Sequence, residues 1–218
     1  AAGIYISDGI VNVGDLSDLK VSAIGGKATV QQSGARADGR AYAYGLGGVN
    51  PSGYGEINVT GNVKIITSAT AGTETDATGK TSPAKFGAYS LFADEGTKIN
   101  IGVDTSKGYP AANGKTVQLE GDILAKTKGI NNVILSGSAS SLQGNIINGN
   151  IYGANNITFT NQATWHPVFD NRYGSFITDG DYTTYSPSYT VNSISTAANL
   201  TLSDKATIDL TWDNATRD

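Results

Sequence analysis

The apolar residues of this chain recur mainly at every second position, in short runs. Because successive side chains of a strand point to opposite sides, this alternation predicts strands of about three to five residues with one apolar face. Gly, Asn and Asp separate the runs, and no helix-length window keeps an apolar period of about 3.6 residues. The pattern predicts an all-β protein. Its clearest strands are 57–59, 63–65, 99–101, 117–119, 133–135, 157–159, 200–202 and 208–210.

An internal repeat narrows the architecture. Ala43-Tyr44-Gly45-Leu46 recurs as Ala88-Tyr89-Ser90-Leu91, and a glycine-led strand follows each copy. These two strands lie 42 residues apart, Ile57 corresponding to Ile99, a distance that fits two coils of about 20 residues each plus loops.

Two architectures use many short strands, a sandwich and a solenoid. A sandwich needs tight hairpins every 8–12 residues or so. Here the loop length varies while the strand motif is kept, which favours a solenoid, the parallel β-helix, with protruding loops. Its inward face should form one stacked core, and its open ends should favour self-association, with Ile4-Tyr5-Ile6 beginning the first coil. The expected inward residues are Ile57, Val59, Ile99, Ile101, Leu119, Leu135, Leu200, Leu202, Ile208 and Leu210.

Composition excludes several classes of function. The 218 residues form one predicted domain, with net charge −4, no Cys and a single His. The missing cysteines exclude a disulfide framework and thiol catalysis, and with one His a structural zinc site is not expected. Lys and Arg are spread along the chain without a basic stripe, which argues against nucleic acid as a partner. No apolar run reaches the roughly 18 residues that a membrane helix needs.

Several motifs, taken in order, resemble passenger domains of Gram-negative autotransporters. The first runs from Val117-Gln118-Leu119-Glu120-Gly121-Asp122-Ile123 through Val133-Ile134-Leu135-Ser136-Gly137 to Ser141-Leu142-Gln143-Gly144-Asn145-Ile146. The second comprises Ala163-Thr164-Trp165, Asn199-Leu200-Thr201-Leu202 and Ala206-Thr207-Ile208-Asp209-Leu210. The resemblance covers about residues 40–218.

The resemblance implies a right-handed parallel β-helix, secreted or displayed on the cell surface, that is adhesive and uses no cofactor. Its partner would be a host surface protein, a glycan or a second copy of the chain. The fragment itself would not insert into a membrane. A separate translocator β-barrel is expected in the full-length protein, because the sequence reaches Asp218 without one.

The most unusual stretch is a predicted loop insertion at 164–190. Seven of the chain's aromatic residues lie between Trp165 and Tyr189, together with the only His, His166. Such long loops are either functional or disordered, and aromatic rings beside Arg and Asp form good recognition surfaces. The alternative is that the rings cover one flank of the solenoid. The predicted ligand-binding residues are Trp165, Phe169, Arg172, Tyr173, Tyr182, Tyr185 and Tyr189.

Catalysis is the alternative function. Asp170, Asp179 and Asp181 resemble a carboxylate set for glycoside cleavage, which would make the chain a polysaccharide-active β-helix enzyme, either a lyase or a glycoside hydrolase. These residues fall in a Gly- and Tyr-rich loop, where Asp179-Gly180 is more simply a turn. The sequence therefore favours a non-enzymatic adhesion or surface-recognition module, with no metal and no catalytic residues.

Overall fold

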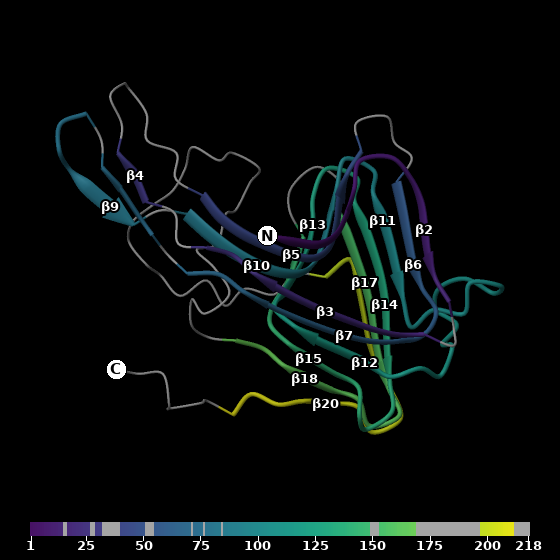
Figure 1. Cartoon of the computed structure of the whole chain (residues 1–218). Helices are drawn as coiled ribbons and strands as arrows, with labels where there is room; N and C mark the ends of the chain where they lie inside the picture. Colours follow the sequence, from purple (N-terminus) through teal and green to yellow (C-terminus); the bar gives the residue numbers. More distant parts are fainter. Residues whose placement is uncertain are drawn as a thin grey trace.

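All regular elements of the described residues are β-strands. The computed structural model (Figure 1) describes residues 1–14, 17–26, 29–31, 40–50, 55–70, 72–75, 77–83, 85–148, 153–168 and 197–211. Within these ranges the chain forms no α-helix, and accordingly no helix that is long and apolar enough to cross a membrane. The predicted all-β class is confirmed.

Most strands belong to three parallel sheets. Sheet A consists of β1 (Ala2–Ile6), β5 (Arg40–Val49), β10 (Lys85–Asp94), β13 (Asp122–Ala125) and β16 (Ile146–Asn148). Sheet B consists of β2 (Gly9–Val13), β6 (Gly55–Val59), β11 (Lys98–Ile101), β14 (Ile130–Ser136), β17 (Ala154–Thr160) and β19 (Asn199–Leu202). Sheet C consists of β3 (Asp18–Ile24), β7 (Asn62–Ser68), β12 (Val117–Glu120), β15 (Ser141–Gln143), β18 (Thr164–His166) and β20 (Thr207–Ile208).

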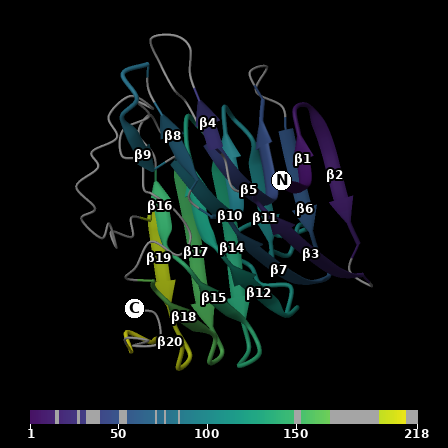
Figure 2. The same cartoon turned by 60° about the vertical axis from the view of Figure 1, so that its left-hand side comes forward.

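The chain passes through sheets A, B and C in turn, and we call one such passage a rung. The first rung is β1-β2-β3 and the fifth is β16-β17-β18, while β19 and β20 belong to the sixth. In Figure 2 the sequence colours run in order across the stacked strands, from purple on the right to yellow on the left. This arrangement of three parallel sheets is compatible with a parallel β-helix.

The internal repeat reports the strand register. Ala43 pairs with Ala88 and Leu46 with Leu91 in sheet A, while Ile57 pairs with Ile99 in sheet B. The repeat therefore marks neighbouring strands, but the expected two coils per repeat are wrong. Since β6 and β11 are direct neighbours, the 42 residues between Asn58 and Asn100 make one rung, enlarged by loops. From Asn132 to Asn156 a rung needs only 24 residues.

The core lies between the three sheets and is built by stacking. Ile57, Ile99, Ile101 and Leu135 are 0% exposed, and Val59 and Leu119 are almost fully buried. At the last rung the expectation of one continuous core is wrong. Leu200, Leu202, Ile208 and Leu210 are 41%, 39%, 37% and 62% exposed. Leu200 aligns with buried Ile157 and Ile208 with buried Trp165, but no described strand lies beyond them.

Corners between the sheets use left-handed backbone. Asn161 and Gln162, with φ of 52° and 69°, turn the chain from β17 to β18. Asp204 and Lys205 repeat this turn one rung later, and Gln162 N donates to the Asp204 carbonyl oxygen at 3.0 Å. Asn and Asp tolerate this conformation better than most residues, which explains their place at the corners.

Two segments between strands of the main sheets carry structure of their own. β8 (Thr73–Thr75) pairs with β4 (Thr29–Gln31) and antiparallel with β9 (Thr81–Pro83), forming a small sheet that projects from the stack in Figure 1. The loop between β11 and β12 is tied to sheet B, because the Tyr109 hydroxyl and the Thr158 hydroxyl lie 2.9 Å apart.

Candidate functional site on the outer face of sheet C

Polar side chains form a continuous strip across the outer face of sheet C. Along β7 and β12, Val63, Ile65 and Leu119 are buried, whereas Lys64 and Gln118 between them point outward. Register repeats this outward position on every rung, so residues far apart in sequence become neighbours. The strip consists of Lys20, Lys64, Gln118, Ser141, Thr164 and Thr207.

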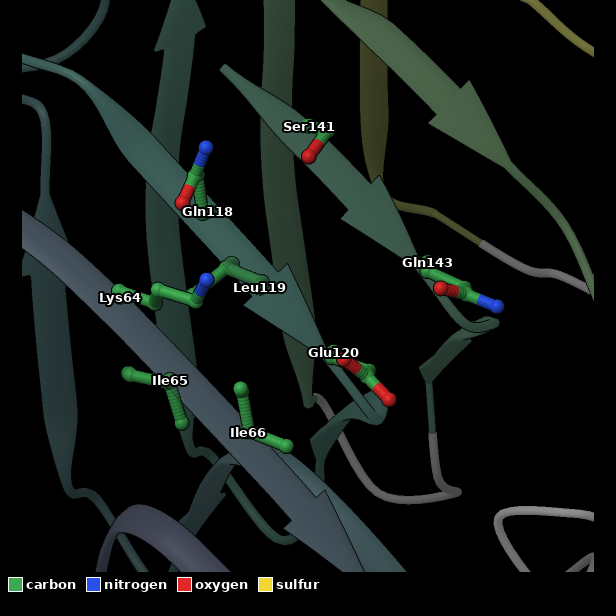
Figure 3. Close-up of a pocket in the computed structure, with 8 residues that line it drawn as sticks. All are labelled: Lys64, Ile65, Ile66, Gln118, Leu119, Glu120, Ser141 and Gln143. Atoms are coloured by element: carbon green, nitrogen blue, oxygen red, sulfur yellow. The ribbon is translucent and has the colours of Figure 1, made fainter. Parts of the chain in front are cut away.

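Two adjoining shallow hollows follow this strip. One, of about 170 Å³, extends from Lys64 across Gln118 and Glu120 to Ser141 and Gln143. The other, of about 240 Å³, lies on the side of the earlier rungs and shares Lys64 and Gln118 with the first. Figure 3 shows the side chains of the first hollow, which come from β7, β12 and β15. Together the hollows form a groove that crosses the strands, and we call it the sheet C groove.

Several polar groups of the groove are available to a ligand. Within the described part of the chain, the side chains of Lys64, Ser141 and Gln143 make no hydrogen bond or ion pair. Gln118 differs, because its Nε2 donates to the Ala139 carbonyl oxygen at 3.0 Å and its amide oxygen is thereby oriented. The groove therefore offers ammonium, hydroxyl and amide groups at fixed spacing.

Charge is distributed unevenly along the groove. Lys20 and Lys64 occupy neighbouring strands and face no described carboxylate within ion-pair distance. Towards the last rung, His166 Nδ1 lies 3.3 Å from Asp209 Oδ2. Hydrogen bonds from the Thr211 side chain and backbone hold the pKa of Asp209 below its usual value, and the charge of His166 acts in the same direction. Lys20 and Lys64 bring two positive charges to the groove, whose lining also includes the carboxylates of Asp18 and Glu120. The contact between His166 and Asp209 lies beyond the lining residues of the groove.

Of the seven predicted ligand-binding residues, the structure describes only Trp165. Its ring is 5% exposed and stacks on Phe159, with centroids 5.8 Å apart and planes at 10°. Its Nε1 donates to the Gly144 carbonyl oxygen at 2.9 Å. In register, Trp165 follows Leu142, so it is a core residue of β18 and offers no exposed ring. Phe169, Arg172, Tyr173, Tyr182, Tyr185 and Tyr189 lie outside the described residues.

The acidic residues considered for catalysis, Asp170, Asp179 and Asp181, also lie outside the described residues. In the part of the chain that the structure does describe, no three His, Asp or Glu side chains are grouped so that they could hold a metal ion.

A second aromatic surface lies on sheet A, where the sequence analysis did not expect a cluster. The rings of Tyr44 and Phe92 are 4.8 Å apart, and Tyr44 stacks on Tyr89 at 5.9 Å. Tyr89 and Phe92 are 7% and 6% exposed. Because these rings pack mainly against one another, they leave little surface for a ligand. The cluster is therefore a weaker candidate for recognition than the sheet C groove.

No protein-family profile, curated protein or solved structure matches the chain. The function proposed for this chain therefore rests on its sequence and on the geometry of the described residues.

Sequence reasoning missed the sheet C groove because its members come from different rungs. Lys64 and Gln118 are single polar residues within separate alternating runs, and each resembles an ordinary solvent-facing position. The one available signal was the repeated apolar-polar-apolar triplet, as in Val63-Lys64-Ile65 and Val117-Gln118-Leu119. Aligning those triplets on neighbouring strands would have brought the two polar residues together.

Proposed function

We propose that this chain is a non-catalytic recognition module, built as a right-handed parallel β-helix, that binds an acidic glycan along the sheet C groove. The observation that supports this most is the line of outward polar side chains that carries no internal partners at Lys64 and Ser141. Adjacent strands lie about 4.8 Å apart, so the line repeats at a short, regular spacing. An extended polymer of polar units suits such a surface better than a compact ligand does.

The lysines favour an acidic polymer over a neutral one. Lys20 and Lys64 lie side by side in register, and a carboxylate on a sugar would relieve the repulsion between their two ammonium groups. Ser141 and Gln143 would accept from and donate to sugar hydroxyls. Ile66, half-buried in the same hollow, supplies an apolar contact for a sugar ring.

Replacing Lys64 tests this proposal. We expect Lys64→Ala to weaken binding to polygalacturonate by about tenfold, because it removes a charge-assisted hydrogen bond. Lys64 is exposed, so the unfolding midpoint should not change. Binding is measured by calorimetry with polygalacturonate and with neutral dextran. Lys107→Ala, in an exposed turn on the loop after β11, is the matched control and should bind like the unaltered chain.

Equal binding of both polymers, or an unchanged affinity of Lys64→Ala, would contradict the proposal. The same incubations distinguish the enzymatic alternative. New reducing ends would indicate a hydrolase, and absorbance from unsaturated sugar ends would indicate a lyase.

The proposal includes export to the surface of a Gram-negative cell as an autotransporter passenger, with the translocator as a separate part of the full protein. Support comes from where the resembling motifs lie. The first spans β12 to β16, and the second continues on β18, β19 and β20, so they follow successive rungs in order. Antibodies against the purified chain should label intact cells of the source bacterium. Labelling only after lysis would contradict surface display.

The aromatic segment remains a predicted second contact for a host protein or glycan. We expect replacement of Tyr182 and Tyr185 by Ala to abolish adhesion while leaving the unfolding midpoint nearly unchanged, since paired Tyr residues give large contact area at low ordering cost. Cell-binding assays and thermal unfolding of the same variant measure the two effects. A large loss of stability, or undiminished adhesion, would instead indicate that these rings pack against the protein.

A further inference from the structure

An unbroken ladder of asparagine side chains crosses the outer face of sheet B. One Asn of each strand aligns with the next, and every pair is joined by a hydrogen bond of 2.7–3.0 Å from Nδ2 to Oδ1. In each bond the later rung donates and the earlier rung accepts. The ladder consists of Asn12, Asn58, Asn100, Asn132, Asn156 and Asn199.

Glu56 fixes the direction of this ladder. Asn100 Nδ2 donates both to Asn58 Oδ1 at 2.7 Å and to Glu56 Oε1 at 2.8 Å. A carboxylate only accepts, so the amino group of Asn100 must face the second rung. Every other amide then follows the same orientation, because a reversed Asn would oppose two donors or two acceptors.

The two ends of the ladder are therefore different and complementary. Asn12 accepts from Asn58, and no described group accepts from its own Nδ2. Asn199 donates to Asn156, and no described group donates to its Oδ1. The first rung thus ends in an unused donor and the last rung in an unused acceptor. Joined copies would complete the ladder only head to tail, since head-to-head contact would oppose two donors.

The apolar residues of the end rungs agree with the same joint. Extending the register of sheet B by one strand brings Val13 of a second copy against Leu200, which is 41% exposed. Sheet C can be extended by one strand in the same way. This places β3 of the second copy, with its half-buried Leu19, beside β20, the edge strand of the last rung. The sheet B joint repeats a contact that already exists between rungs, as between Val59 and Ile101.

We infer that the last rung of one copy binds the first rung of another, so that the protein assembles head to tail through continued sheets B and C. Such a contact is heterologous, and it leaves each added copy with an open end that accepts the next. The inference does not rest on glycan binding, because the joint uses the ends of the stack whereas the sheet C groove lies on its side.

Ladder variants test this joint with little change to the fold. Asn12→Asp still accepts from Asn58 but can no longer donate, so it should weaken assembly by about tenfold or more. Asn199→Lys still donates to Asn156 but no longer accepts, and it should have a similar effect. Combined in one chain, the two substitutions place the new carboxylate of one copy against the new ammonium group of the next and should restore assembly. Sedimentation equilibrium across the accessible concentration range measures the mean mass, and circular dichroism checks folding.

Gln143→Glu makes the same amide-to-carboxylate change on the side of the stack and should assemble like the unaltered chain. Mixing the two single variants is a second test, because joints between two unaltered ends then alternate with joints between the new carboxylate and the new ammonium group. The mixture should therefore assemble, although neither variant assembles alone. An unaltered chain that stays monomeric would overturn the inference. It would indicate that a different protein segment covers the exposed last rung. A dimer that does not grow, or full assembly of Asn12→Asp, would also overturn it.

Discussion

Truncating Ile101 to Ala is expected to lower the free energy of unfolding by about 2–5 kcal/mol, the usual cost of removing a large side chain from a packed core. Ile101 is 0% exposed, and in sheet B it lies between Val59 and Val133. Neighbouring rungs hold these residues at fixed spacing, so the cavity cannot close easily. Urea unfolding followed by circular dichroism measures the change.

Leu202→Ala is the matched control, because Leu202 has the same inward register but lies on the last rung. It aligns with buried Phe159 yet is 39% exposed, so less apolar area is lost on truncation. We expect a cost below about 1.5 kcal/mol at a protein concentration where the chain is monomeric. Equal losses for the two variants would mean that the last rung is covered as well as the third. A neutral Ile101→Ala would contradict the stacked core itself.

This contrast shows how far the sequence predicts the fold. Alternation gave the inward face of Leu202 correctly, since strand period alone decides which side a residue faces. Whether that face is buried depends on the rung above it, and alternation carries no information about that neighbour. The repeat also shows which residues are equivalent, since Tyr44 and Tyr89 pair on neighbouring strands. It did not show how many coils separate its copies, because long loops extend a single rung to 42 residues.

The candidate site was less predictable than the fold. Trp165 was grouped with the aromatic residues that follow it, but its triplet Thr164-Trp165-His166 has the polar-apolar-polar order of the strands before it. That order was the local signal for a core position. The sheet C groove had no such local signal, since its residues come together only through the register of rungs whose lengths range from 24 to 46 residues.

Asp122 links stability to pH. Its carboxyl lies at the corner where β12 leads into β13, is 7% exposed, and accepts a hydrogen bond from Asn145 N at 2.8 Å. Burial raises the pKa of Asp122 to about 7, against the opposing effect of that hydrogen bond. The neutral acid is therefore the form that the folded protein favours.

The direction of the pH dependence follows from this raised pKa. Below about pH 4 the carboxyl is protonated in both the folded and unfolded chain, and the folded state has its full stability. Between about pH 4 and pH 7 the unfolded chain ionises while the folded chain keeps its proton, so stability falls as pH rises. We expect a loss on the order of 3 kcal/mol across this window, measured as unfolding free energy at several pH values.

Asp122→Asn should abolish most of this dependence and should be more stable than the unaltered chain at neutral pH. The amide oxygen still accepts from Asn145 N, so the corner is kept while the charge is removed. The same corner also positions the residues after β18, because the Asn145 side chain forms two hydrogen bonds, of 3.1 and 3.2 Å, with the backbone of Val168.

Asp104→Asn is the control for the Asp122 experiment, since hydrogen bonds from the Ser106 and Lys107 side chains lower the pKa of Asp104 to about 2. A lowered pKa gives stability that is lost only as pH falls towards 2, outside the window in question. This variant should therefore keep the slope between about pH 4 and pH 7 that Asp122→Asn removes. If Asp122→Asn kept that slope as well, the pH dependence would have to come from another group, and the carboxyl of Asp122 would be ionised in the folded protein.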